Sequence, residues 1–141
     1  MSARSFIIIA AEQRSAEWFA ARAGRLTGSK AGCVTDFLKS GKESAARRDY
    51  RLQLVCERVT GRPQEDGDGF VNAAMLRGIE LEPKAFAAYE ALTGSVAVRT
   101  GFLSHATHQA GCSLDGHVDG FDGIVEIKCP KSATHLGYWR G

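Results

Sequence analysis

Residues 124–129, with the sequence IVEIKC, constrain the fold most strongly. Their side chains alternate between apolar and charged with the period of a β-strand, and Pro130 follows. Two earlier segments, VAVRTGFLSH and GCSLDGHVD, are rich in β-branched residues and are separated by glycine or polar turns. Residues 95–130 are therefore predicted to form short strands of a β-sheet, with a hairpin at the end.

The chain before residue 95 has helical spacing instead. Apolar side chains recur every three or four residues, which is typical of helices packed on one face. The predicted helices cover residues 15–24, 27 or 29 to 41, 43–60 and 72–93. Ser15 is suited to cap the first helix and Gly24 to end it. Gly78 and Pro83 predict a kink or a break in the fourth.

These patterns predict a mixed α/β (α+β) fold in one domain over residues 1–141. Its helical half covers residues 15–94 and its β-hairpin core covers residues 95–130. The segment FIIIAA predicts a strand before the first helix, and another helix is predicted to begin within residues 132–141 with Ser132 as its cap. Helices would pack on the sheet, because each apolar face needs a partner.

Composition excludes several classes of protein. The segment FIIIAA is too short to span a bilayer and lacks the features of a signal peptide, so we expect a cytoplasmic protein without a membrane partner. Residues 1–58 carry 11 Lys and Arg against 6 Asp and Glu, whereas the remainder carries 7 against 10. A basic half beside an acidic half suits a protein that attracts a polyanion and holds a cation near it.

The segment LDGHVDGFDGIVEIKCP, residues 114–130, contains four acidic residues. Counted from Asp115, their spacing is close to that of an EF-hand calcium loop, except that His117 stands at the third position. Helices flank such a loop, whereas a strand is predicted here. A surface hairpin with an acidic turn explains Asp119 and Asp122. It does not explain why Glu126 and Lys128 share one face of an apolar strand, about 7 Å apart.

A metal site explains both parts of this segment. If Asp115 lies on the strand before the turn, the hairpin brings it close to Glu126. Two carboxylates can hold a hard divalent cation such as Mg²⁺. Lys128 could then orient or deprotonate a water, or neutralise developing charge. Such a site suits hydrolysis of a phosphodiester.

The strings CSLDG and EIKCP, on either side of the turn, resemble the D…(D/E)-x-K core of the PD-(D/E)XK nuclease superfamily. More narrowly, they are similar to those of the phage lambda-exonuclease-like recombination nucleases. Leu114 stands where a proline often precedes the aspartate. The resemblance implies a restriction-endonuclease-like mixed sheet flanked by helices. It also implies Mg²⁺, for which Mn²⁺ substitutes, bound by Asp115, Glu126 and the carbonyl of Ile127, with Lys128 as a catalytic residue.

Two further segments resemble the same family. RGIELEPKAFAAYE, from Arg77, is similar to a helix in which a glutamate faces the metal site, and that glutamate corresponds to Glu82. Glu82 is therefore expected to be a second-metal or water-mediated ligand. WFAARAGRLTGSKAG, from Trp18, is similar to a segment whose arginine and serine bind the terminal 5′-phosphate. These correspond to Arg22 and Ser29, which suit a phosphate chemically.

The activity implied is 5′-to-3′ degradation of one strand of linear double-stranded DNA in phage-type recombination. Family members form homotrimeric rings around DNA and work with a single-strand annealing protein, so both are expected partners. They usually continue well beyond the E-x-K strand, so the chain is expected to be truncated at Gly141. An endonuclease of the same superfamily, or a non-catalytic DNA-binding protein with a truncated site, remains the alternative.

Overall fold

The fold is described from a computed structural model, which places residues 5–64, 72–121 and 123–140. Helices and strands both contribute, as the sequence predicts. The chain forms two compact units. The first comprises Met1–Gly69 and Thr100–Leu114, and the second comprises Phe70–Arg99 and Asp115–Gly141. The single nuclease domain over 1–141 stays a prediction. In the described parts of the chain, no helix is long and apolar enough to cross a membrane.

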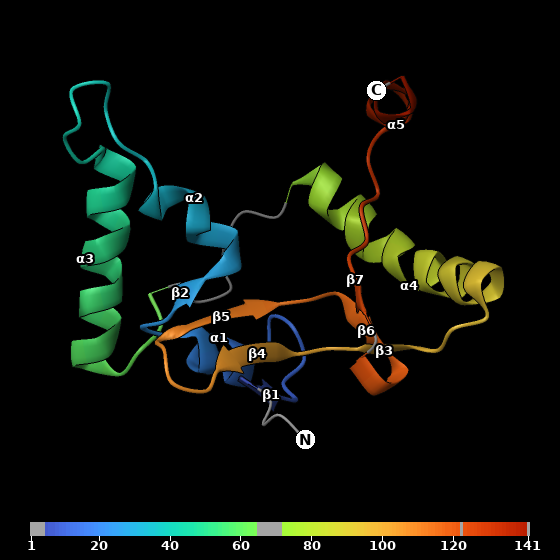
Figure 1. The fold of residues 1–141 in the computed structure, drawn as a ribbon, viewed down its shortest axis with the longest axis horizontal. Coiled ribbons are helices and arrows are strands. Elements are labelled where there is room, and N and C mark those ends of the chain that lie inside the picture. Colours follow the sequence, from blue (N-terminus) through green and yellow to red (C-terminus); the bar gives the residue numbers. More distant parts are fainter. Residues whose placement is uncertain (1–4, 65–71, 122, 141) are drawn as a thin grey trace. The chain divides into compact units, whose positions relative to one another are not determined.

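The first unit contains a four-stranded sheet with the order β1-β4-β5-β2 (Figure 1). Its strands are β1 (Phe6–Ile9), β2 (Leu26–Thr27), β4 (Phe102–His105) and β5 (Ala110–Ser113). Neighbouring strands are antiparallel except for β2 and β5, which are parallel. Phe102 is fully buried, and its ring lies over Gly111, where any Cβ would collide with it. The core of this unit therefore depends on a glycine opposite a large aromatic ring.

Helices α1 (Ala16–Arg22) and α3 (Ala45–Thr60) begin at serine caps. Ser15 Oγ accepts a hydrogen bond from the backbone N–H of Trp18 at 3.1 Å, as predicted. Ser44 Oγ does the same for Arg47 at 3.1 Å. Helix α3 ends at Gly61, whose φ of 66° is left-handed and favours glycine. These two helix predictions are confirmed to within two residues at each end.

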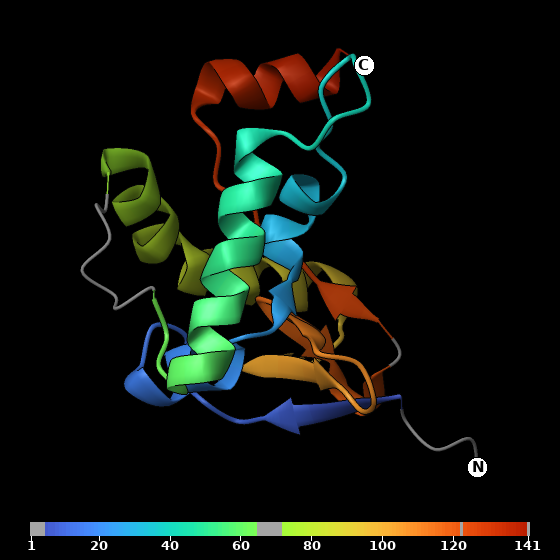
Figure 2. The same ribbon diagram turned by 90° about the vertical axis from the view of Figure 1, so that its left-hand side faces the viewer.

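The predicted helix from Thr27 or Ser29 to Gly41 is wrong in length. Thr27 belongs to β2, and only a 3₁₀ turn (Gly28–Lys30) and the short α2 (Ala31–Val34) follow. Beyond α2 the chain forms a bridge between Phe37 and Glu43, closed by a turn at Gly41 with φ 78°. Val34-Thr35-Asp36 has low helical propensity, so the tertiary contacts win over the apolar spacing. Figure 2 shows α2 alongside α3, which it contacts.

The second unit contains a three-stranded sheet with the order β3-β6-β7 and two helices. These elements are α4 (Ala73–Thr93), β3 (Ala97–Arg99), β6 (Gly116–Val118), β7 (Ile124–Val125) and α5 (Ser132–Trp139). Phe86 of α4 is buried and packs on β6, where a Cβ on Gly116 would lie 2.8 Å from its ring. Gly116 therefore allows α4 to approach the hairpin closely.

Helix α4 runs through Gly78 and Pro83 without a break. Pro83 cannot donate to the carbonyl four residues earlier, and Figure 1 shows a bend in the axis of α4. Helix α5 begins at Ser132, as predicted, although Lys131 is its capping residue. The strand predicted up to Cys129 ends at Val125, because the short β6 offers no further paired residues.

Candidate active site

The hairpin of the second unit brings Asp115 beside the E-x-K segment. In the antiparallel ladder between β6 and β7, Gly116 pairs with Val125 and His117 with Ile124. The ladder ends there, one step before Asp115 and Glu126 would pair. The Oδ2 atom of Asp115 accepts a hydrogen bond from the backbone N–H of Ile127 at 2.6 Å. Asp115 is thus fixed against the E-x-K segment, as the sequence predicts, although that segment lies outside the ladder.

The turn of the hairpin is held by its own backbone and by Asp119. The N–H of Val118 donates to the carbonyl of Gly123 at 2.9 Å, and Asp119 Oδ1 accepts from the N–H of Gly120 at 2.9 Å. Gly120 has a left-handed φ of 79°. Asp119 is therefore a turn residue, as predicted, while Asp122 lies outside the described residues. Strand β5 precedes residues 115–126, and β6 and β7 lie within them, whereas an EF-hand loop needs a helix directly on either side, so an EF-hand is excluded.

Glu126 and Lys128 form an ion pair at the solvent-exposed edge of the hairpin. The side chain of Glu126 is 50% exposed and that of Lys128 is 72% exposed, whereas Val125, the last residue of β7, is buried. The hydrogen bond from Lys128 to Glu126 raises the pKa of Lys128 above its usual value. Burial opposes this effect, and the charges of Glu126 and Asp115 add smaller contributions that raise the pKa further. Lys128 is therefore a cation at neutral pH.

Glu82 lies on the face of α4 that packs against the hairpin, because it precedes the buried Phe86 by one helical turn. Its Oε1 atom is 2.9 Å from a guanidinium nitrogen of Arg99, whose guanidinium also lies 5.1 Å from the centre of the Phe86 ring. Among the described residues, no three His, Cys, Asp or Glu side chains are close enough to hold a metal ion together. Glu82 therefore forms an ion pair with Arg99, and it lies next to the hairpin that carries Asp115.

Arg22 and Ser29 lie together in the first unit. Arg22 is the last residue of α1, and one guanidinium nitrogen lies 3.5 Å from the Ser29 hydroxyl oxygen. Its guanidinium carbon lies 4.0 Å from the centre of the Trp18 ring, which fixes the side chain by a cation–π contact. Arg22 is half-buried and Ser29 is exposed. The two side chains predicted to bind a phosphate therefore meet at one place.

Sequence reasoning missed Ser113, the last residue of β5. Its hydroxyl oxygen accepts a hydrogen bond from the indole N–H of Trp18 at 2.9 Å and lies 3.4 Å from a second nitrogen of Arg22. The string CSLDG places Ser113 two residues before Asp115, which was the available signal. Trp18 contacts both the Ser113 hydroxyl and the Arg22 guanidinium and so helps to orient this cluster.

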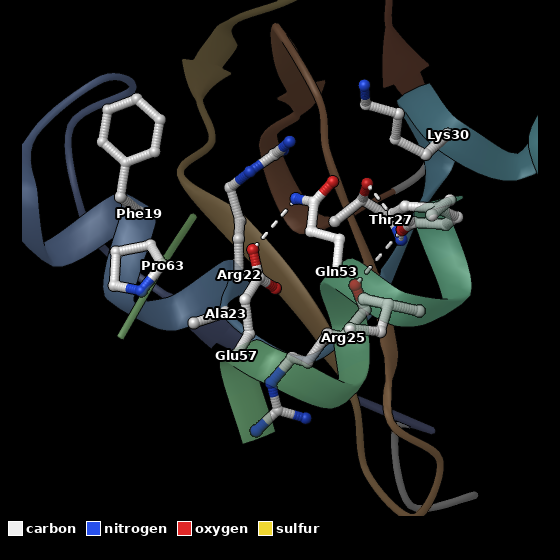
Figure 3. Close-up of a pocket in the computed structure, with 11 residues that line it drawn as sticks. Phe19, Arg22, Ala23, Arg25, Thr27, Lys30, Gln53, Glu57 and Pro63 are labelled. Carbon is white, nitrogen blue, oxygen red and sulfur yellow. Dashed lines mark hydrogen bonds between the residues drawn. The ribbon is translucent and has the colours of Figure 1, made fainter. Parts of the chain in front are cut away.

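A small pocket of about 20 Å³ lies beside Arg22 (Figure 3). Buried Glu57 of α3 lines it and accepts a hydrogen bond from Gln53 at 3.0 Å. Burial alone raises the pKa of the Glu57 carboxyl, but hydrogen bonds from Gln53, Gly24 and Gln64 more than offset this effect. The pKa of Glu57 is therefore below its usual value, and the group is ionised at neutral pH.

Comparisons with known proteins identify relatives of this chain. The family model of the YqaJ-like viral recombinase domain matches residues 17–141. No curated protein matches the sequence. A crystal structure of LHK-Exo in complex with dAMP is similar, with a TM-score of 0.70 and 39% sequence identity. A crystal structure of the alkaline exonuclease LHK-Exo from Laribacter hongkongensis has a TM-score of 0.69 and 40% identity.

Each of these two matches covers 89% of this chain and 59% of the LHK-Exo chain. The protein thus spans less than two thirds of the length of these structural relatives. The family model nevertheless covers both the segment with Arg22 and the hairpin with Asp115. The predicted resemblance to phage recombination nucleases is confirmed, and the chain belongs to the family of YqaJ-like viral recombinase domains.

Proposed function

We propose that this protein is a DNA exonuclease that uses Mg²⁺ to hydrolyse phosphodiester bonds, in the 5′-to-3′ direction on linear double-stranded DNA. The observation that carries the proposal is the hydrogen bond from the N–H of Ile127 to the Asp115 carboxylate, which holds Asp115 beside the E-x-K segment. Family membership and the likeness to an alkaline exonuclease support the same chemistry.

Asp115 and Glu126, with the carbonyl of Ile127, are the proposed metal ligands. They fit Mg²⁺, because all three offer oxygen atoms and lie on one hairpin. When bound, Mg²⁺ supplies Lewis-acid polarisation of the phosphoryl group and a more acidic water. Mn²⁺ is expected to substitute, because it prefers the same ligands.

Lys128 and Glu82 complete the proposed site. Because Lys128 is a cation, its ammonium group is suited to orient the attacking water and to stabilise the negative charge that develops on the phosphate. Glu82 is proposed as a ligand of a second ion, directly or through water. It can take this role only after releasing Arg99, its present partner.

Arg22 and Ser29 are proposed to bind the terminal 5′-phosphate of the digested strand. A guanidinium can donate two hydrogen bonds to one phosphate, and a hydroxyl can donate a third. The Ser113 hydroxyl lies in the same cluster and adds a further donor. This cluster would give the enzyme its preference for phosphorylated ends.

The remaining proposals rest on the family resemblance. Members act as homotrimeric rings with a single-strand annealing protein, so the same assembly and partner are proposed for this protein. DNA ends are the proposed substrate, and the cytoplasm is the proposed location. The basic first half of the sequence supports attraction of a polyanion.

Digestion of a linear 5′-phosphorylated duplex and of its covalently closed circular form, each with Mg²⁺ or with EDTA, tests the proposal. We expect loss of the linear duplex only, and only with Mg²⁺. Cutting of the circle would instead identify an endonuclease. Binding of DNA without hydrolysis under any of these conditions would identify a non-catalytic DNA-binding protein.

A further inference from the structure

Three side chains of α3 hold the backbone of residues 24–27, which follow α1 and include β2. Glu57 Oε2 accepts a hydrogen bond from the N–H of Gly24 at 2.7 Å, and Arg58 Nε donates to the carbonyl of the same residue at 2.7 Å. Tyr50 Oη accepts from the N–H of Thr27 at 3.0 Å. Glu57 and Arg58 follow Tyr50 by seven and eight residues, about two helical turns, so the three side chains lie on the same side of α3. We call Tyr50, Glu57 and Arg58 the α3 clamp.

Glu57 is the central member of the α3 clamp. It is only 5% exposed, and its other oxygen, Oε1, accepts a hydrogen bond from Gln53 Nε2 at 3.0 Å (Figure 3). The same oxygen accepts a second hydrogen bond from the N–H of Gln64, also at 3.0 Å. A buried carboxylate is stable only when its oxygens are paired in this way. The N–H groups of Gly24 and Gln64 and the side-chain amide of Gln53 all donate to this carboxylate, so it is held in one orientation. The Gly24 peptide is fixed with it.

The held segment connects the two proposed phosphate ligands. Arg22 precedes Gly24 by two residues, and Ser29 follows it by five. Gly24 has a left-handed φ of 69°, and a Cβ there would lie 2.7 Å from Arg58 Cγ. The backbone at Gly24 therefore has little freedom to shift. The distance between the Arg22 guanidinium and the Ser29 hydroxyl depends on this turn.

We propose that Glu57 is a positioning residue for end recognition: by holding the Gly24 turn it sets the geometry of Arg22 and Ser29 and thereby the preference for a 5′-phosphate. Glu57 does not contact the phosphate itself. The inference rests on the proposed function of Arg22 and Ser29, and it adds a residue outside the segment WFAARAGRLTGSKAG that resembles the family. A glutamine cannot replace Glu57, because its amide nitrogen would face at least one N–H donor.

The test measures equilibrium binding of the full chain to two fluorescent duplexes that differ only in a 5′-phosphate or a 5′-hydroxyl, without divalent ions. The wild type is expected to prefer the phosphate, and Arg22→Ala to lose that preference. Glu57→Gln is expected to reduce the preference about tenfold, which corresponds to one lost charge-assisted hydrogen bond. Its affinity for the 5′-hydroxyl duplex is expected to stay unchanged. Glu17→Gln, which removes an exposed acid from α1, is the matched control.

Equal weakening of binding to both duplexes in Glu57→Gln would show a merely structural role and overturn the inference. A full phosphate preference in Glu57→Gln, together with its loss in Arg22→Ala, would also overturn it while sparing the proposed function. Preference retained in Arg22→Ala would overturn both. If Glu57→Gln does not fold, Arg58→Lys replaces it, because Arg58 is exposed and only its bond to Gly24 is lost. The same criteria then apply.

Discussion

Replacing Glu57 with glutamine should lower the free energy of unfolding, and the loss should depend on pH. Three N–H donors converge on the two carboxylate oxygens at 2.7, 3.0 and 3.0 Å, in a site that is 5% exposed. Glutamine has one acceptor oxygen, so at least one buried donor loses its partner and faces an amide nitrogen instead. A buried unsatisfied donor costs roughly 1–3 kcal/mol, so we expect a loss of about 2 kcal/mol at pH 7.

The sign of the pH dependence follows from the lowered pKa of Glu57. Its pKa in the folded protein lies below the usual value of 4.5. The stabilisation is therefore fully present above 4.5 and is lost as the pH falls through the folded-state pKa. The difference between wild type and Glu57→Gln should be largest near pH 7 and should shrink near pH 3. Glutamine does not titrate, so only the wild type loses this contribution.

Urea denaturation followed by circular dichroism, at pH 7 and at pH 3, measures this difference directly. In thermal unfolding, about 2 kcal/mol corresponds to a shift in Tm of roughly 6 °C for a chain of this size. Glu17→Gln controls for the removal of an exposed acid and should shift neither value by more than about 0.5 kcal/mol. Equal stability of Glu57→Gln and wild type at pH 7, or a difference that persists unchanged at pH 3, would refute the reasoning.

Three other substitutions probe the two units. Phe102→Ala should cost about 3–5 kcal/mol in urea denaturation, because Phe102 is fully buried; a loss below 1 kcal/mol would contradict the assigned core. Gly24→Ala should lower Tm and weaken the 5′-phosphate preference, since the left-handed φ and Arg58 Cγ at 2.7 Å oppose a Cβ; a variant like wild type in both would argue against a fixed turn. Arg99→Ala should lower the Mg²⁺ concentration for half-maximal hydrolysis by freeing Glu82, and an unchanged Mg²⁺ titration would contradict the proposed role of Glu82.

The hairpin geometry could be predicted from the sequence because it depends on local rules. Alternation of side chains fixes which residues share a face, and the glycines and Asp119 mark the turn. A tight hairpin then has few possible registers, and the observed one brings Asp115 beside the E-x-K segment, where its carboxylate accepts a hydrogen bond from the N–H of Ile127. The helices that begin at Ser15 and end at Gly61 follow from capping rules in the same way.

The predictions that failed depend on contacts between distant segments. The apolar spacing after Ser29 is compatible with a long helix, but the bridge between Phe37 and Glu43 and the contacts of α2 with α3 shorten it. A sequence pattern does not report such competition. The expected strand up to Cys129 ends early for a related reason, because a strand needs a partner as well as alternation.

The contacts of Glu57 and Ser113 could not be predicted at all. Glu57 bonds to Gly24 across 33 residues, and Ser113 bonds to Trp18 across 95. A glutamate in a helix normally lies in solvent, and nothing in the local sequence of α3 distinguishes Glu57 from its exposed neighbours. Only the fold shows that this carboxylate is buried against a glycine turn.

Release of nucleotides from a linear 5′-phosphorylated duplex, with and without Mg²⁺, tests the central claim most directly when wild type is compared with Lys128→Ala and Lys131→Ala. Lys131 is an exposed lysine just before α5 and controls for the loss of one positive charge close to the hairpin. We predict Mg²⁺-dependent release by wild type and Lys131→Ala, and a loss of at least about 100-fold in Lys128→Ala, the smallest effect typical of a catalytic group. Release by Lys128→Ala at the wild-type rate would contradict an active site at this hairpin.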